Sequence, residues 1–370
     1  MNKRSNTAFI NATSVYTACG NTEETFNALF TKQSGLKAVS DYIVNKTVCI
    51  GKFPTSKNFE EILIACVEEI IVQIPDLDFS QTLLLVGSSV GGMANSEKTL
   101  FQEKSYKNIQ IKKHPIEVIA ATLDAKFNFY ATRSFSTACT SSANALKTAK
   151  ELIEIGAYDN ILVIGADEIC STTVFGFDSL GILSDSICTP FQNERKGMNV
   201  AEGIGVLLLQ NKALSNIALV GAGSSSDAHH IANPDPEAKG AIKAISDALL
   251  DASIEASQID YVNAHGTGTQ ANDASEAKAV LNLFGETTFI SSSKSTFGHT
   301  LGAAGAIEAI VCVEVLKRQY LAPQIFTQNT ETDIAIVKDA SSAKLHYVLS
   351  NSLAFGGNNT SLIFGVVHEN

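Results

Sequence analysis

Short apolar runs alternate with longer amphipathic stretches along most of the chain, a pattern typical of α/β proteins. Near-continuous apolar runs favour strands that are covered on both faces, and such strands are predicted at residues 83–87, 161–165, 204–209, 217–221, 260–263 and 361–366. Helical periodicity predicts helices at 59–73, 142–155, 240–255, 273–284 and 303–317. The last of these begins with small residues, which favours close packing against another helix.

The order of these segments echoes itself. A strand that runs into a glycine-rich turn occurs as LLLVGSSVGGM from Leu83 and again as YVNAHGTGTQAND from Tyr261. A polar loop followed by a helix rich in small residues occurs as STACTSSANALKTAKELI from Ser136 and as STFGHTLGAAGAIEAIVCVEVL from Ser295. Fixed-order self-similarity of this kind indicates an internal duplication. We therefore expect two similar α/β halves, residues 1–213 and 214–370.

Composition and charge narrow the class of protein. The chain has 370 residues, of which 45% are hydrophobic and 18% charged, so a large core is expected. A net charge of −11 disfavours a broad nucleic-acid surface. Residues 1–20 lack the apolar run of a signal peptide, and no stretch reaches the ~18 apolar residues of a spanning helix. We expect a cytoplasmic protein without a membrane span.

The cysteines argue against a disulfide or zinc scaffold. They lie at positions 19, 49, 66, 139, 170, 188 and 312, without CxxC pairs or regular spacing. Cys139 differs from the rest, because it falls between a strand end at 134–138 and a helix start at Ser141. A thiol at a helix N-terminus is favoured as the nucleophilic thiolate, and neighbouring backbone N–H groups can bind an oxyanion. The alternative for this segment is a buried, inert cysteine.

His265 lies in the segment YVNAHGTGTQAND, directly after a predicted strand. Its neighbours Gly266 and Gly268 allow close approach of the backbone to a ligand. Thr267 and Thr269 alternate with these glycines, so their hydroxyls can point the same way and bind the amides of a long polar arm. The alternative is a histidine in an ordinary turn.

His299 lies in SSSKSTFGHTLGAAG, with Lys294 before it and Glu308 after it. A lysine and a glutamate near a histidine can hold its tautomer and tune its pKa; the alternative is a surface loop with unrelated charges. The segment NSLAFGGNNTSLIF places Phe355 before two glycines, which predicts either an aromatic gate beside a pocket or a simple hairpin turn. Five further histidines are expected to be structural: His114, His229, His230, His346 and His368.

Four blocks together resemble a known family. TACTSS, NAHGTGTQAND, KSTFGHTLGAAGAIEA and NSLAFGGNN are similar, in order, to the signature blocks of β-ketoacyl-(acyl carrier protein) synthases of the Cys-His-His class, and the resemblance extends from Val86 to Gly365. The run EICSTTVFGFDSLGILS resembles the bacterial elongating synthases. The resemblance implies an α/β thiolase-like fold, with two similar βαβαβαββ halves in a five-layer α-β-α-β-α sandwich. It also implies a homodimer, or a heterodimer with a related ketosynthase or chain-length-factor subunit.

The resemblance further implies a reaction, in which Cys139 takes an acyl chain from an acyl carrier protein. His265 and His299 then assist the decarboxylation of malonyl-carrier protein, and the carbanion attacks the acyl group to give a 3-oxoacyl product. The family's pattern makes the backbone N–H groups of Cys139 and Phe355 the oxyanion donors, with Phe355 as a gate. Lys294 would pair with Glu276 or Glu308.

The same resemblance groups Thr267, Thr269, Glu276 and Glu308 as substrate-binding residues, with the two threonines on the phosphopantetheine arm. No resident cofactor or metal is implied, because phosphopantetheine arrives on the carrier protein. An acidic carrier would need a basic patch, and the densest lysine cluster is Lys104, Lys107, Lys112 and Lys113. The alternative for that cluster is a solvated loop.

The sequence departs from the family's pattern at several positions. Ala354 stands where glycine usually precedes the gating phenylalanine, so a stiffer gate is expected. Thr140 replaces the commoner serine or alanine, and residues 188–205 lack the usual acidic–basic run. These departures favour a specialised pathway, such as polyene, aryl polyene or polyketide synthesis, over housekeeping fatty acid elongation.

Three alternatives compete with a condensing enzyme. A chain-length-factor-type partner subunit shares the fold but normally lacks the nucleophile, which Cys139 supplies here. A coenzyme A thiolase needs a second cysteine in the C-terminal half, where only Cys312 occurs, inside a predicted helix. A cysteine hydrolase of another fold would not need two similar halves.

Overall fold

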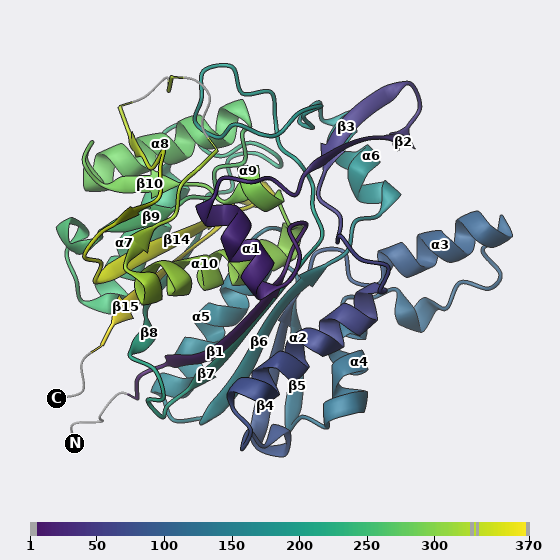
Figure 1. Ribbon diagram of the computed structural model, residues 1–370, viewed down its shortest axis with the longest axis horizontal. Helices are drawn as coiled ribbons and strands as arrows, with labels where there is room; N and C mark the ends of the chain where they lie inside the picture. The colour runs from purple at the N-terminus through teal and green to yellow at the C-terminus, as the bar shows by residue number, and fades with distance from the viewer. Residues whose placement is uncertain (1–5, 326–328, 331–332, 368–370) are drawn as a thin grey trace.

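The computed structural model describes residues 6–325, 329–330 and 333–367 (Figure 1). The signal-peptide expectation rests partly on residues 1–5, and one histidine expected to be structural is His368; both lie outside the described residues. No helix in the described ranges is long and apolar enough to cross a membrane.

The main sheet is built from two halves with the same strand order. In the first half the order is β1 (Phe9–Tyr16), β7 (Gly203–Gln210), β6 (Asn160–Asp167), β4 (Thr82–Gly87) and β5 (Ala131–Phe135). In the second half it is β8 (Ile217–Ser226), β15 (Asn358–Val366), β14 (Tyr347–Leu353), β9 (Tyr261–Asn263) and β10 (Phe289–Ser291), with β12 (Ala335–Ile336) at the edge. In each order the first three strands pair antiparallel, and the third to fifth pair parallel toward the outer edge of the sheet. The halves join where Phe9 of β1 pairs with Ala218 of β8.

Helices form three layers around these two half-sheets. Between them lie α5 (Ser141–Glu154) and α10 (Ala304–Arg318), which contact each other and strands of both halves. The first half-sheet is covered outside by α2 (Phe59–Gln73) and α4 (Glu117–Phe127), and the second by α7 (Lys239–Ala252) and α8 (Gln270–Phe284). Three buried apolar clusters fill the gaps between layers. The predicted five-layer arrangement of two βαβαβαββ halves is confirmed.

The central layer depends on small residues, as the start of the 303–317 helix predicts. A Cβ atom on Gly305 would lie 2.7 Å from the Cβ of Ala143. The helices α5 and α10 therefore cross so closely that only glycine fits at position 305. Likewise, a Cβ atom on Gly165 of β6 would lie 2.8 Å from the Cβ of Ala306. This close packing brings the first turn of α10 beside the first turn of α5, and therefore brings the loops that precede them together.

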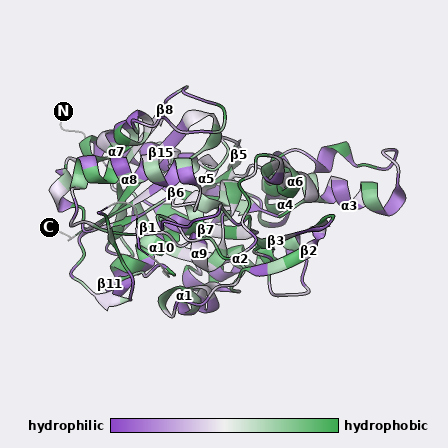
Figure 2. Ribbon diagram, turned by 90° about the horizontal axis from the view of Figure 1, so that it is seen from above, coloured by the Kyte–Doolittle hydropathy of each residue, from purple (hydrophilic) through white to green (hydrophobic). Residues whose placement is uncertain are grey.

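Several further elements lie outside the main sheet and its covering helices. They are α1 (Thr22–Phe30), the hairpin β2 (Lys37–Ile43) and β3 (Lys46–Ile50), α3 (Met93–Glu103), α6 (Ser171–Ser179), the short helix α9 (Lys294–Phe297), and the two-stranded pair β11 (Tyr320–Leu321) and β13 (Ser341–Ser342). Helix α3 projects from the layered body in both views (Figures 1 and 2). The cluster Lys104, Lys107, Lys112 and Lys113 is exposed on the segment that follows it.

Candidate active site

Cys139 occupies a sharp turn between β5 and α5. The preceding residue, Ala138, has a left-handed backbone with φ of +53°. Its carbonyl accepts hydrogen bonds from the Ser141 hydroxyl at 2.6 Å and the Ser89 hydroxyl at 2.9 Å, which hold the strained turn in place. Thr140 is the N-cap residue of α5, and its hydroxyl donates to the Thr137 carbonyl at 2.6 Å. The predicted position of the thiol at a helix N-terminus is confirmed.

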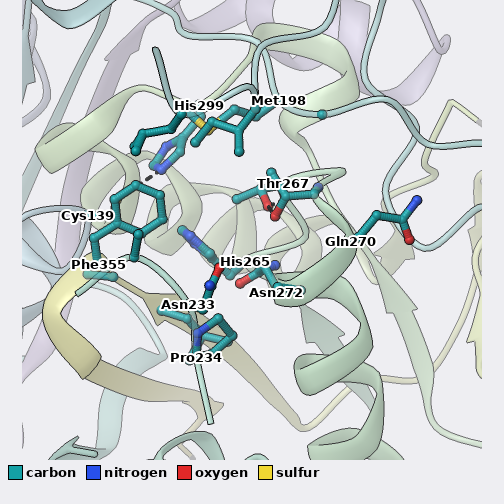
Figure 3. A pocket seen from close by; sticks show the side chains of 18 of the residues that line it. Cys139, Met198, Asn233, Pro234, His265, Thr267, Gln270, Asn272, His299 and Phe355 are labelled. Atoms are coloured by element: carbon teal, nitrogen blue, oxygen red, sulfur yellow. Dashed lines mark hydrogen bonds between the residues drawn. The ribbon is translucent and has the colours of Figure 1, made fainter. Parts of the chain in front are cut away.

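His299 lies in the loop between α9 and α10, and its Nε2 atom is 3.1 Å from the Sγ of Cys139 (Figure 3). The backbone N–H of Leu301 donates to Nδ1 of the same ring at 3.2 Å. Because Nδ1 accepts this bond, the neutral ring carries its proton on Nε2. His299 therefore presents an N–H donor to the space beside the sulfur.

His265 follows β9 and faces His299 across the site. The ring centroids are 5.1 Å apart and the planes are almost perpendicular. Nζ of Lys294 lies 3.4 Å from Nδ1 of His265, and the same ammonium donates to the carboxylate of Glu308. An ammonium can only donate, so Nδ1 of His265 is the acceptor and its neutral ring also carries the proton on Nε2. Of the two predicted partners for Lys294, the structure places Glu308 in contact.

Burial decides the charge states at the site. Burial, followed by the charge of Lys294, lowers the pKa of both His265 and His299 well below 6.5, so both rings are neutral at pH 7. Burial also raises the pKa of the Cys139 thiol to about 12, although Lys294 and the backbone N–H groups of Cys139 and Phe355 act in the opposite direction. Desolvation therefore opposes, and outweighs, the stabilisation of the thiolate that the helix N-terminus favours.

Glu276 and Glu308 bind groups next to the histidines on the side away from the cavity. The Glu276 carboxylate accepts the backbone N–H groups of His265 and Gly266, both at 2.8 Å. Glu308 holds Lys294, and both side chains of that pair are 1% exposed. Neither glutamate lines the cavity at the site. Their grouping with substrate-binding residues is corrected accordingly: they position the residues that face the cavity.

A cavity of about 440 Å³ opens in front of the sulfur. Cys139, His265, His299 and Phe355 line it, together with Thr267 and Thr269, whose hydroxyl oxygens lie 2.9 Å apart. The predicted common direction of the two threonine hydroxyls is thus observed. Further lining residues carried no sequence prediction, among them Met198, Asn233, Pro234, Gln270 and Asn272 (Figure 3). Phe177 also lines the cavity.

His230 was expected to be only structural, yet it lines this cavity. Its Nδ1 accepts the backbone N–H groups of Ala232 and Asn233, which shapes the loop 227–234 at the mouth. The sequence carries a weak signal for this loop, since DAHHIANPDP combines turn residues with two histidines directly after a strand.

Phe355 sits at the tip of the β14–β15 hairpin, so the gate and hairpin interpretations describe the same segment. Its ring centroid is 6.0 Å from that of Phe177 in α6. Gly356 and Gly357 both have positive φ, +81° and +77°, and the loop 227–234 clamps them. Gly356 N–H donates to the Ile231 carbonyl at 2.8 Å, and the Gly357 carbonyl accepts the N–H of Asp227 at 3.0 Å.

Ala354 directly precedes Phe355. Its backbone has φ of −114° and ψ of +154°, an extended conformation that any L-residue adopts. The Cβ therefore imposes no backbone strain in this conformation, and the strict need for glycine begins two residues later. The extended conformation requires no glycine at position 354, and the expectation that Ala354 stiffens the gate stays a prediction about its movement.

The three reactive groups could be taken for a metal site by distance alone. The sulfur of Cys139 and one ring nitrogen each of His265 and His299 all lie within 4.8 Å of one another. A metal would need the Nε2 lone pairs, but both Nδ1 atoms accept hydrogen bonds and leave the protons on Nε2. The Lys294 ammonium also opposes a second cation. The arrangement suits donation of two N–H groups to an oxygen atom.

Two family models cover most of the chain. The model "Beta-ketoacyl synthase, N-terminal domain" matches residues 64–214, and "Beta-ketoacyl synthase, C-terminal domain" matches residues 217–328. A curated 3-oxoacyl-(acyl-carrier-protein) synthase 2 of Staphylococcus aureus is 36% identical over 247 residues, 62% of this chain and 61% of the relative. A Saccharomyces cerevisiae 3-oxoacyl-(acyl-carrier-protein) synthase homolog is 34% identical over 310 residues, 76% of this chain and 70% of the relative. The chain spans about three fifths of the length of the S. aureus proteins it matches.

Solved structures give the same result over nearly the full length. A structure of a ketosynthase in complex with its chain length factor from Xenorhabdus doucetiae matches with a TM-score of 0.90 and 33% identity, covering 98% of both chains. A β-ketoacyl synthase from Burkholderia phymatum matches with a TM-score of 0.90 and 28% identity, covering 98% of this chain and 100% of that one. The chain therefore belongs to the β-ketoacyl synthase family and has the thiolase-like fold of its ketosynthases.

Proposed function

We propose that this protein catalyses the decarboxylative condensation of an acyl chain on Cys139 with a malonyl-carrier protein, giving a 3-oxoacyl-carrier protein. One observation carries the proposal: a nucleophilic sulfur and two histidine Nε2–H donors face a single cavity. A cysteine hydrolase would need a histidine that accepts a proton from its nucleophile. Here both neutral histidines are fixed as donors, which suits an enolate oxygen.

The first half-reaction would be acyl transfer. The sulfur of Cys139 attacks the carbonyl carbon of an acyl thioester, and the carbon–sulfur bond to the carrier's phosphopantetheine breaks. The thiol proton ends on the departing phosphopantetheine sulfur, so charge and atoms balance. The backbone N–H groups of Cys139 and Phe355, which both lower the pKa of the thiol, would stabilise the oxyanion. Thr267 and Thr269 would bind the amides of the phosphopantetheine arm.

The second half-reaction would form the carbon–carbon bond. Malonyl thioester loses carbon dioxide, and the electron pair of the broken bond becomes an enolate whose oxygen accepts the Nε2–H groups of His265 and His299. The enolate carbon attacks the acyl-Cys139 carbonyl, and the sulfur leaves and takes up a proton from solvent. Neutral histidines suit this role, since the site then gains no second positive charge beside Lys294.

Mass spectrometry after incubation with acyl-carrier protein tests the proposal. We expect the acyl mass on the peptide that contains Cys139, and no such mass in Cys139→Ala. Cys312→Ala is the matched control and should acylate normally, since Cys312 is buried within α10 and does not line the cavity. Absence of acylation at Cys139 in the wild-type protein, across acyl chains of several lengths, would refute the proposal.

Two alternatives are weaker on the same observations. A chain-length-factor-type subunit would have no use for a cysteine with a complete set of donors around it. A coenzyme A thiolase would need a second reactive cysteine at the cavity, and among the described lining residues Cys139 is the sole cysteine. Acylation of Cys139 without any carbon dioxide release from malonyl thioester would favour the thiolase.

The carrier protein is proposed to dock by charge. The segment after α3 carries four exposed lysines, at positions 104, 107, 112 and 113, in a chain of net charge −11. Replacing all four with glutamate should weaken carrier-protein binding at least tenfold at low salt. A control with the same change in charge substitutes four exposed lysines elsewhere: Lys57, Lys212, Lys239 and Lys344. Equal affinity in both quadruple variants would sink this docking site.

A second ketosynthase-type subunit, identical or related, is proposed to bind at β5. This strand ends the sheet order with β4 as its only strand neighbour among the described residues, and such edges pair readily with another chain. A light-scattering mass of a dimer, with slow amide exchange at 131–135, is expected; a monomer that condenses at full rate would overturn the proposal.

The seven free cysteines support a reducing, cytoplasmic location. We further propose a specialised polyene or polyketide role, on the departures at Thr140 and 188–205.

A further inference from the structure

Asp167, at the end of β6, is a fully buried carboxylate with an unusual number of donors. Its oxygens accept the Ser88 hydroxyl at 2.5 Å and the backbone N–H groups of Ser89, Val90 and Gly302 at 2.7–3.1 Å. The side chain is 0% exposed and does not line the cavity. A buried carboxylate is costly, so its four donors indicate a position that the fold holds firmly.

These donors come from both halves of the molecule. Ser89 in the first half connects to the turn before Cys139, and Gly302 in the second half connects to the turn after His299. Ser89, whose N–H binds Asp167, donates its hydroxyl to the carbonyl of Ala138, the strained residue before Cys139. On the other side, Gly302 directly follows Leu301, whose N–H holds Nδ1 of His299. Leu301 itself has a left-handed φ of +54°.

The contact between the halves at this point is tight. A Cβ atom on Gly302 would lie 2.6 Å from the backbone nitrogen of Ser89. The Asp167 carboxylate thus closes a short chain of bonds that runs from the Cys139 turn, through Ser89 and Asp167, to Gly302 and the His299 turn. In packed interiors such a chain fixes distances, because its members have few alternative positions.

We propose that Asp167 is a positioning residue that sets the separation between Cys139 and His299, and through it the reactivity of the Cys139 sulfur. This rests on the proposed function only in so far as Cys139 is the nucleophile. Asp167→Asn keeps the shape but replaces one acceptor oxygen with an NH₂ group, which faces backbone N–H donors and cannot accept them. The chain of bonds then opens between the halves.

The test is a double-mutant cycle read out by alkylation of Cys139 with iodoacetamide, quantified on the Cys139 peptide. Asp167→Asn should slow alkylation about 30-fold, since small misplacements of reacting groups cost one to two orders of magnitude. In a His299→Ala background the same substitution should slow it less than about 3-fold, because the partner it positions is gone. A general loss of folded protein would act equally in both backgrounds.

Two controls and a second variant keep the test decisive. Asp260→Asn is the matched control, since Asp260 also accepts two backbone N–H groups, at His346 and Tyr347, but away from the cavity. If Asp167→Asn does not fold, Ser89→Ala removes only the hydroxyl bond to Ala138 and should slow alkylation about 5-fold. Ser215→Ala, which loses a comparable bond to the Ile10 carbonyl, should have no effect.

Equal slowing by Asp167→Asn with and without His299 would overturn the proposal, and so would unchanged alkylation in folded Asp167→Asn or Ser89→Ala. Alkylation needs no carrier protein and no condensation. A protein that alkylates as expected but forms no 3-oxoacyl product would therefore contradict the proposed function and leave the role of Asp167 supported.

Discussion

The Nε2 atom of His299 lies 3.1 Å from the Sγ atom of Cys139, although 160 residues separate them in the chain. Each residue precedes the central helix of its own half, α5 or α10, and these helices cross so closely that only glycine fits at position 305. The reactive pair is thus a product of the duplicated architecture: neither half alone contains the site.

The pH dependence of Cys139 alkylation should reveal its burial. The pKa of about 12 means that the thiolate fraction of the empty enzyme rises tenfold with each pH unit below that value. The alkylation rate should therefore climb from pH 7 to pH 10 without a plateau, while a small-molecule thiol levels off near pH 9. A plateau at or below pH 8 would show a pre-formed thiolate and contradict the account.

Loss of either histidine should affect decarboxylation strongly. His265→Ala and His299→Ala each remove one Nε2–H donor from the enolate oxygen, and loss of such a donor costs about 100- to 1,000-fold in rate. The measurement is carbon dioxide release from malonyl-carrier protein. His346→Ala should release it at the wild-type rate, because His346 is exposed just before β14 and does not line the cavity. A drop of less than fivefold in both site variants would exclude the donor role.

Removing only one partner of the Lys294–Glu308 pair should lower the free energy of unfolding more than replacing both partners. Lys294→Met leaves the Glu308 carboxyl buried without its partner and should lower the free energy of unfolding by roughly 3 kcal/mol, as for other broken buried pairs. Lys294→Met combined with Glu308→Gln should recover part of that loss. Chemical denaturation measures both; an additive result would mean that the pair does not act as a unit.

The same lysine should control histidine charge. Burial lowers the pKa of both rings most and Lys294 lowers it further, so Lys294→Met should raise both pKa values while leaving them below 6.5. In the wild-type protein, NMR titration should find His265 and His299 neutral throughout pH 6.5–8, with their protons on Nε2. Titration of either ring within that range in the wild type would contradict the assigned charge states.

Gly357 offers a test of the gate with a close control. Its φ is +77°, and an added Cβ would lie 2.3 Å from a carboxylate oxygen of Asp227. Gly156 has a similar φ of +71°, and the added atom would meet only the Asn6 amide nitrogen, at 3.4 Å. Both alanine variants should lose about 1–2 kcal/mol of stability. Only Gly357→Ala should also lower condensation, by at least tenfold; equal activities would separate the Phe355 loop from catalysis.

Much of the architecture could be predicted from the sequence, because the duplication is visible in the order of its segments. The strand-and-turn segments 83–93 and 261–273 form β4 and β9, and the two small-residue helices form α5 and α10, in equivalent places of the two halves. Strand β10 escaped prediction because it is only three residues long. Of β5 only the end was predicted, at 134–138, because ATRSF is polar and half-buried; the strand is Ala131–Phe135.

What could not be predicted depends on burial and on contacts between the halves. The sequence predicts the helix terminus beside Cys139. The upward shift of the Cys139 pKa, however, follows from desolvation, which depends on the packed structure. The choice of Glu308 over Glu276 as partner of Lys294 is likewise set by packing. Asp167 gave little signal, since an acidic residue at a strand end is common and its donors lie up to 135 residues away.

The central claim is a coupled condensation at Cys139, and the most direct measurement starts from enzyme already acylated there. Addition of malonyl-carrier protein labelled in its free carboxylate should release one labelled carbon dioxide for each acyl group that leaves Cys139. The acyl chain should appear, two carbons longer, as 3-oxoacyl-carrier protein. Release of the acyl group as a free acid, or its retention on Cys139 while carbon dioxide is lost, would contradict the account.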